Sequence, residues 1–179
     1  MIVYEGIKSS FMNDVDLNVI ADKILSRYIE VFHRRTGESE INSWKESMLR
    51  MRGVLADKEI PDDSGVAIEY NIPHTSNRID FLLSGYDSNQ KNSIIIVELK
   101  QWQHVKAIEG KDGVVETYTG KAAREVTHPS YQAWSYASLI DNFNQDVIDK
   151  DIKLHPCTFL HNYDLTNEDP INSDQYQIY

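Results

Sequence analysis

The chain has 179 residues, of which 41% are hydrophobic and 26% charged, as expected for one globular domain with a sizeable core. Acidic residues outnumber basic ones by 28 to 18, and the net charge of −10 weighs against a general nucleic-acid-binding surface. The single cysteine excludes an internal disulfide and a cysteine-rich zinc site. No apolar run approaches the roughly 20 residues of a membrane span, and no signal peptide is recognisable, so we expect a cytoplasmic protein without a membrane partner.

The first half of the chain predicts helices followed by strands. Apolar residues recur three and four positions apart over residues 14–35, and again from a cap at Ser39 to residue 55. Residues 1–12 have no clear pattern. Three β-branched runs separated by turn residues then predict a meander of strands, at residues 65–73, 78–85 and 93–100.

The second half is less regular. We predict a hairpin, a short basic connector, a helix that begins with proline, and a further strand, at residues 105–118, 120–124, 129–143 and 155–160. The chain is therefore expected to be a single domain. It would comprise an N-terminal helical part (1–38), a core (39–163) and an irregular tail (164–179).

Charged residues interrupt two of the apolar strands. Asp80 lies in the second strand, and Glu98 and Lys100 lie at the end of the third. Residues two apart in a strand share a face, so Glu98 and Lys100 project together, and Asp80 on the neighbouring strand could join them. Two carboxylates would supply the oxygen ligands that Mg²⁺ or Mn²⁺ prefers, and the lysine could orient or deprotonate a metal-bound water. These residue types form a minimal set for metal-dependent hydrolysis of a phosphodiester.

Spacing alone does not identify this site, because Glu109–Lys111 and Asp151–Lys153 repeat the acid-x-lysine pattern. Those copies lie in a glycine turn and a polar run, whereas Glu98–Lys100 ends an apolar strand that follows another acid-bearing strand. The same residues could instead form a cross-strand ion network at the rim of the sheet. Spacing and strand context leave both interpretations open.

The segments Arg78-Ile79-Asp80 and Ile96-Val97-Glu98-Leu99-Lys100 resemble the PD-(D/E)XK nuclease superfamily, with isoleucine in place of the family's proline. The resemblance implies an α/β, restriction-endonuclease-like fold, in which an αβββαβ core forms a central mixed sheet flanked by helices. It implies that Asp80 and Glu98 bind Mg²⁺ or Mn²⁺ and that Lys100 is catalytic. It also implies an acid from the first core helix, for which Glu40 is the candidate and Glu46 the alternative.

Gln132 and Tyr136 lie four positions apart and therefore on one face of the predicted helix. They look like the QxxxY motif of the RecB-like branch of the superfamily. In that interpretation Gln132 bonds a metal-bound water or a carboxylate, and Tyr136 contacts a phosphate or a base. An amphipathic helix with core aromatics would give the same spacing. Lys121 and Arg124, just before this helix, could contact a phosphate or form a solvated basic loop.

A narrower resemblance extends over most of the chain. It looks like the N-terminal nuclease-like domain of bacterial proteins that carry a C-terminal Schlafen-like P-loop DNA/RNA helicase domain. The segments that carry it lie at residues 43–44, 68–73, 98–102, 124–130 and 160–163. No Gly-x-x-x-x-Gly-Lys-[Ser/Thr] motif occurs in the chain. We therefore expect part of such a protein or a truncated relative, with a helicase domain as its partner in cis.

Two functions follow as alternatives. The first is metal-dependent cleavage of nucleic acid, with DNA favoured over RNA. The second is a nuclease-fold module that binds nucleic acid or a helicase domain without cutting. The acid, acid, lysine set favours the first, and the net charge of −10 favours the second.

Overall fold

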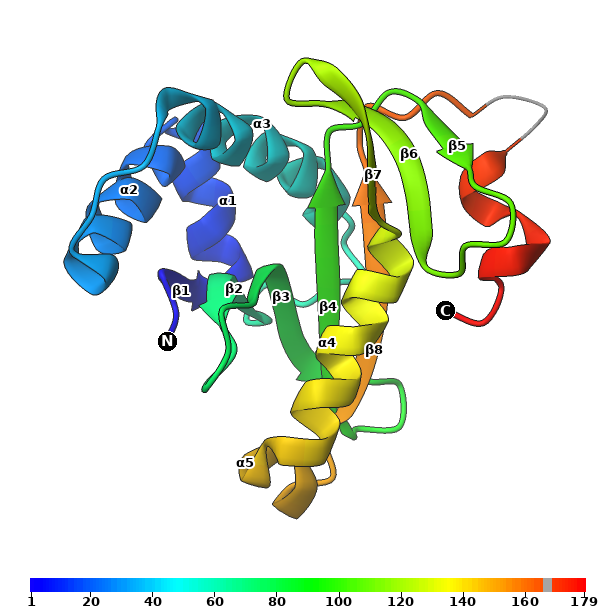
Figure 1. Ribbon diagram of the computed structural model, residues 1–179. Coiled ribbons are helices and arrows are strands. Elements are labelled where there is room, and N and C mark those ends of the chain that lie inside the picture. The colour runs from blue at the N-terminus through cyan, green and yellow to red at the C-terminus, as the bar shows by residue number, and fades with distance from the viewer. Residues whose placement is uncertain (166–168) are drawn as a thin grey trace.

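A computed structural model describes residues 1–165 and 169–179 (Figure 1). Its main sheet has five strands in the order β1-β2-β3-β4-β8, in which β4 and β8 are parallel and the other neighbours antiparallel. The strands are β1 (Tyr4–Ile7), β2 (Gly65–Asn71), β3 (Arg78–Tyr86), β4 (Asn92–Lys100) and β8 (Lys153–Leu160). The helices are α1 (Lys8–Asp16), α2 (Ile20–Phe32), α3 (Glu38–Leu55), α4 (Pro129–Phe143) and α5 (Gln145–Asp149).

Helices cover both faces of this sheet. Side chains from α1, α2 and α3 form one core with Val66, Phe81 and Leu99, whereas α4 and α5 form another with Ile96 and Ile72. The order α3-β2-β3-β4-α4-β8 gives the predicted helix, three strands, helix and strand. The predicted α/β class with a central mixed sheet is thus confirmed. Within the described ranges, no helix is long and apolar enough to cross a membrane.

A second, three-stranded sheet lies between β4 and α4 in sequence. It consists of β5 (Val105–Ala107), β6 (Val114–Thr119) and β7 (Ala122–Thr127), all antiparallel. The pairing of β5 with β6 confirms the predicted hairpin. The connector predicted over residues 120–124 is wrong, because Ala122 already begins β7. Gly120 and Lys121 form the two-residue turn with φ of 59° and 70°, the left-handed pair that joins tight hairpins.

The N-terminal part differs from the expected single helix over residues 14–35. The chain first adds β1 to the edge of the sheet, and α1 then ends before α2 begins. Asn18 between them has a φ of 57°, so it cannot continue a right-handed helix. The periodicity is the same on both sides of this break, which is why the sequence pattern hides it.

The described part of the C-terminal tail contains two single turns of 3-10 helix, Pro170–Asn172 and Asp174–Tyr176, and is otherwise irregular. Ile171 and Tyr176 are nonetheless buried against Val105 and Val115 of the small sheet. Part of the tail predicted over residues 164–179, at 166–168, lies outside the described residues. The tail therefore completes the core of the small sheet.

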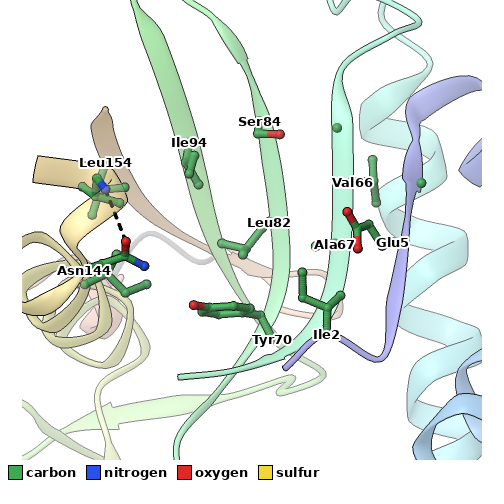
Figure 2. Close-up of a pocket in the computed structure, with 14 residues that line it drawn as sticks. Ile2, Glu5, Val66, Ala67, Tyr70, Leu82, Ser84, Ile94, Asn144 and Leu154 are labelled. Atoms are coloured by element: carbon green, nitrogen blue, oxygen red, sulfur yellow. Dashed lines mark hydrogen bonds between the residues drawn. The ribbon is translucent and has the colours of Figure 1, made fainter. Parts of the chain in front are cut away.

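An apolar pocket of about 270 Å³ lies on the α4 side of the main sheet (Figure 2). Tyr70, Leu82 and Ile94 of β2, β3 and β4 line it, together with Ile140 and Leu154. The pocket lies toward the end of the sheet where β2 begins, away from the predicted charged residues.

Candidate functional site

The candidate site lies where the pairing of β2 with β3 is interrupted. The two strands pair on both sides of Glu69 and Asp80 but not at that step, and Glu69 has a φ of 55°. Ile68 and Phe81 point to the α1–α3 core, yet Tyr70 and Ile79 point to the α4 core. Each strand thus holds one extra residue, a bulge, and the alternation of faces shifts in both strands together. Asp80 therefore lies outside the regular alternation.

The bulge coincides with a separation of β3 from β4. Their last paired residues are Phe81 and Val97, although β4 continues to pair with β8 as far as Lys100. Asp80 takes the place of the missing ladder contact, because its Oδ2 accepts a hydrogen bond of 2.8 Å from the Leu99 amide. The Asp80 carboxylate thereby lies beside Glu98, at the point where β3 and β4 have separated.

Glu98 is almost fully buried, and cationic or polar donors hold one of its oxygens. Oε1 accepts hydrogen bonds from Lys100 Nζ at 2.6 Å and from Gln132 Nε2 at 2.7 Å. Oε2 is buried and accepts no hydrogen bond from any residue in the described part of the chain. An unsatisfied buried carboxylate oxygen is costly, so this atom calls for a proton or a cation.

The electrostatics of the site follow from burial and crowding. Burial first, and then the neighbouring Asp80 charge, raise the pKa of Glu98 to about 8, against the opposing effect of Lys100. Burial also raises the pKa of Asp80, although Lys100 and the Leu99 amide oppose the change. A buried and a half-buried carboxylate side by side do not both ionise readily without a compensating charge. They must share a proton, or a cation must take its place.

Lys100 stays protonated in this setting. Burial alone would lower its pKa, but Glu98 and Asp80 outweigh burial and raise the pKa above its ordinary value. Its Nζ also lies 5.6 Å from the centre of the Trp102 ring, a cation–π contact. A lysine in this state can orient a water or neutralise developing charge, but it is a poor base for deprotonating that water.

The residues present could bind a hard divalent cation, with the small set of protein ligands that such a site commonly uses. The unpartnered Glu98 Oε2 and the adjacent Asp80 carboxylate would supply the protein oxygens, and water the remaining ligands, as Mg²⁺ commonly requires. Among residues 1–165 and 169–179, no group of three or more His, Cys, Asp or Glu side chains is arranged to hold a metal. The donor set is therefore two carboxylates.

Helix α4 brings the predicted Gln132 and Tyr136 to this site. His128 caps the helix by accepting a hydrogen bond from the Ser130 amide, and Pro129 takes the first helical position. Gln132 Nε2 then reaches Glu98 at 2.7 Å and the Tyr136 hydroxyl at 3.0 Å. Gln132 therefore bonds a carboxylate, the first of its two predicted roles, and Tyr136 lies beside it at the half-buried edge of the site.

The predicted Glu40 lies on α3, on the other side of Asp80, and is held by other residues. Its Oε1 accepts from Arg78 Nη2 at 3.2 Å, and its Oε2 accepts from the Thr36 hydroxyl. It lines a polar cavity of about 190 Å³ that also borders Asp80. Glu40 is thus near the carboxylate pair but paired with Arg78.

Sequence reasoning missed the group around Arg78. Arg78 Nη1 lies 2.7 Å from Glu69 Oε2, and Trp44 Nε1 donates to Glu69 Oε1 at 2.8 Å. Burial raises the pKa of Glu69 to about 7, against the opposing effects of Arg78 and Trp44. The signal was available, because Glu69 is a charged residue in an apolar strand, as Asp80 is.

Lys121 and Arg124 lie apart from the carboxylates, in the turn and second strand of the β6–β7 hairpin. Both are exposed, and neither makes an ion pair with another described residue. By contrast, Lys106 and Lys111 of the same region pair with Glu116 and Glu125. In Figure 1 this hairpin extends beyond the end of β4 that carries Lys100.

Comparison with known proteins adds no relative. No protein-family model matches the chain, and neither the curated proteins nor the solved structures contain a significant match. The function must therefore be argued from the site.

Proposed function

We propose that the chain is a metal-dependent phosphodiesterase of the PD-(D/E)XK nuclease type, acting on nucleic acid with DNA preferred, and that Mg²⁺ or Mn²⁺ is its cofactor. One observation carries the proposal. The buried Glu98 Oε2 accepts no hydrogen bond from the described residues and lies beside the half-buried carboxylate of Asp80. This pair requires a positive charge, and a divalent cation would satisfy both carboxylates at once.

The chain's own residues would act in distinct ways. Asp80 and Glu98 would hold the cation, which activates water and polarises a phosphoryl oxygen when bound. Lys100, fixed by Glu98, would stabilise negative charge as it develops on the phosphate. Gln132 would keep Glu98 oriented, and Tyr136 would face the substrate at the edge of the site.

The surroundings offer a limited surface for the polyanion. Lys121 and Arg124 are cations without ion-pair partners among the described residues, and we propose that they contact phosphates beyond the scissile bond. Glu40 would lie near the site without contacting the cation, because both of its carboxylate oxygens already accept hydrogen bonds, from Arg78 and Thr36.

A second function is favoured by the net charge of −10. In this alternative the same fold binds nucleic acid, or a P-loop helicase domain in the same protein, without cutting. The carboxylate pair would then share a proton permanently, and cations would not bind at physiological concentrations. The two proposals therefore differ in a measurable property, the affinity for Mn²⁺ or Mg²⁺.

The deciding experiment combines cleavage and binding. Purified protein with Mg²⁺ or Mn²⁺ is expected to degrade single- or double-stranded DNA, and Asp80→Ala should abolish the activity while circular dichroism stays unchanged. Calorimetric titration with Mn²⁺ at pH 7, in buffers of different ionisation heat, should show release of up to about one proton, because the cation displaces the proton held by the carboxylates. If Mn²⁺ binds without cleavage of any DNA or RNA, the hydrolytic proposal fails. If neither occurs, the non-cleaving module is favoured.

A further inference from the structure

We infer that Glu69 is a positioning residue for Asp80. Together with Arg78 it stabilises the paired bulges that turn the Asp80 carboxylate toward β4. The inference rests on the proposed function only for its kinetic consequence, since the positioning itself can be measured without any reaction.

The first step of the argument is geometric. Without the bulges, Asp80 would follow the alternation of β3 and share the face of Leu82 and Ile96, on which Glu98 also lies, but it would not take the place of a backbone acceptor on β4. A regular ladder would also continue past Phe81, and the Leu99 amide would then have no reason to bond a side chain. The bond that fixes the Asp80 carboxylate to the Leu99 amide therefore depends on the irregular step that Glu69 shares with Asp80.

The second step concerns what holds Glu69 in a left-handed conformation that non-glycine residues rarely adopt. Trp44 Nε1 and Arg78 Nη1 engage its two carboxylate oxygens from α3 and from β3, at 2.8 and 2.7 Å. The side chain is buried, so these contacts are shielded from water. A bulge does not by itself require a carboxylate side chain. The contacts of Glu69 with Trp44 and Arg78 explain why a carboxylate is present at this position.

The third step connects this group to Asp80 through the chain. Arg78 lies two residues before Asp80 in β3, and its guanidinium also contacts Glu40 and lies 5.6 Å from the Tyr28 ring. Both strands flanking the bulge are thus tied to the helical layer, Glu69 through Trp44 and Arg78 through Glu40. Loss of the Glu69 charge would release β3 at Arg78, two residues before the bulge.

The test measures hydrogen exchange of backbone amides by NMR on the full chain without added metal. Glu69→Gln keeps an acceptor for Trp44 but removes the charge that faces Arg78. It should accelerate exchange of the Leu99 amide by about tenfold or more, because the amide loses its Asp80 acceptor part of the time. The amide of Val97, one strand position before the opening, should change by less than about twofold. In Arg78→Lys the single ammonium group cannot contact both Glu69 and Glu40, so this variant should also accelerate exchange of the Leu99 amide.

Glu116→Gln is the matched control, since Glu116 is a strand carboxylate paired with Lys106 at 3.4 Å in the small sheet. It should leave Leu99 exchange unchanged. If the enzyme is active, Glu69→Gln should lower kcat by about tenfold with little change in KM, as expected when a ligand is misplaced but the binding surface stays intact. Unchanged Leu99 exchange in both Glu69→Gln and Arg78→Lys would overturn the inference. A wild-type protein with a protected Leu99 amide but no metal binding would instead overturn the proposed function alone.

Discussion

Two cavities border the same strands and differ in almost every respect. The apolar pocket of about 270 Å³ lies where β2 and β3 pair regularly, and its walls include Tyr70 and Leu82 (Figure 2). The polar cavity of about 190 Å³ lies where the pairing is broken, and it is bordered by Glu69, Arg78 and Asp80. Regular strands supply apolar walls, whereas charged groups enter where the ladder is interrupted.

The apolar pocket and the polar cavity differ in how much they cost the stability of the fold. An apolar pocket of this size costs only lost packing, which a larger side chain can recover. Buried carboxylates cost far more, and the protein tolerates them only with partners such as Arg78 and Lys100. We therefore expect substitutions at the polar end to change activity strongly and those at the apolar end to change mainly stability.

Among substitutions that leave the two proposed metal ligands in place, the largest effect is expected from Lys100→Ala. It removes the cation that faces both carboxylates, and the rate of DNA cleavage should fall by about a hundredfold or more. Lys153→Ala is the control, because Lys153 forms the same acid-x-lysine ion pair with Asp151 at 2.6 Å on an exposed strand end. Its cleavage rate should stay within about twofold of wild type. Equal loss in both variants would show that general positive charge, and not the site, controls cleavage.

A smaller loss is expected from Gln132→Ala. The variant removes one donor to Glu98 Oε1 and the bond to Tyr136, while Lys100 remains in place. Affinity for Mn²⁺ or the cleavage rate should fall by about tenfold, as is usual for residues that orient a metal ligand. Ser138→Ala, at a half-buried position of the same helix that lines a separate cavity beside β8, should have no such effect. A fully active Gln132→Ala protein would contradict the role given to α4.

The comparison also explains how much the sequence could predict. Alternating and continuous apolar runs predicted β2, β3, β4 and β8, and the Pro129 signal predicted α4, because these elements follow regular periodicity. The convergence of Glu98, Lys100 and Gln132 was likewise foreseeable, since strand alternation and helix spacing fix which face each side chain occupies.

The bulges were not foreseeable, because a single extra residue in each strand leaves the composition of both strands unchanged. Alternation from Leu82 predicts that Asp80 shares the face of Glu98, but it does not predict the open ladder in which Asp80 bonds the Leu99 amide. Arg78 and Glu69 lie nine residues apart in sequence, on opposite sides of a turn. Their pairing depends on a register that neither strand encodes by itself.

The pH dependence of stability tests the charge of the polar end directly. The pKa of Glu98 is about 8 in the folded protein, against an ordinary value of 4.5 that applies when the chain is unfolded. Between these two pH values the folded state therefore holds a proton that the unfolded state has released. The contribution of Glu98 to stability is fully present below about pH 4.5 and is lost as the pH rises through about 8. Without metal, the Tm should fall over this range, and Glu98→Gln, which stays neutral, should flatten the fall. A Tm that rises from pH 5 to pH 8 in both proteins would contradict the raised pKa.

The smallest effect is expected at the apolar end, from Ala67→Val. Ala67 borders the apolar pocket in β2, and valine suits a strand and would occupy part of the empty space. The free energy of unfolding in urea should rise by up to about 1 kcal/mol, with the cleavage rate unchanged. Ala123→Val, at an exposed position of β7, controls for strand propensity and should gain less. Ala67 lies only two residues from Glu69, so a change in cleavage rate would mean that the bulge transmits packing from one cavity to the other. An unchanged rate would mean that the bulge separates them, because Trp44 and Arg78 fix Glu69 independently of what fills the pocket.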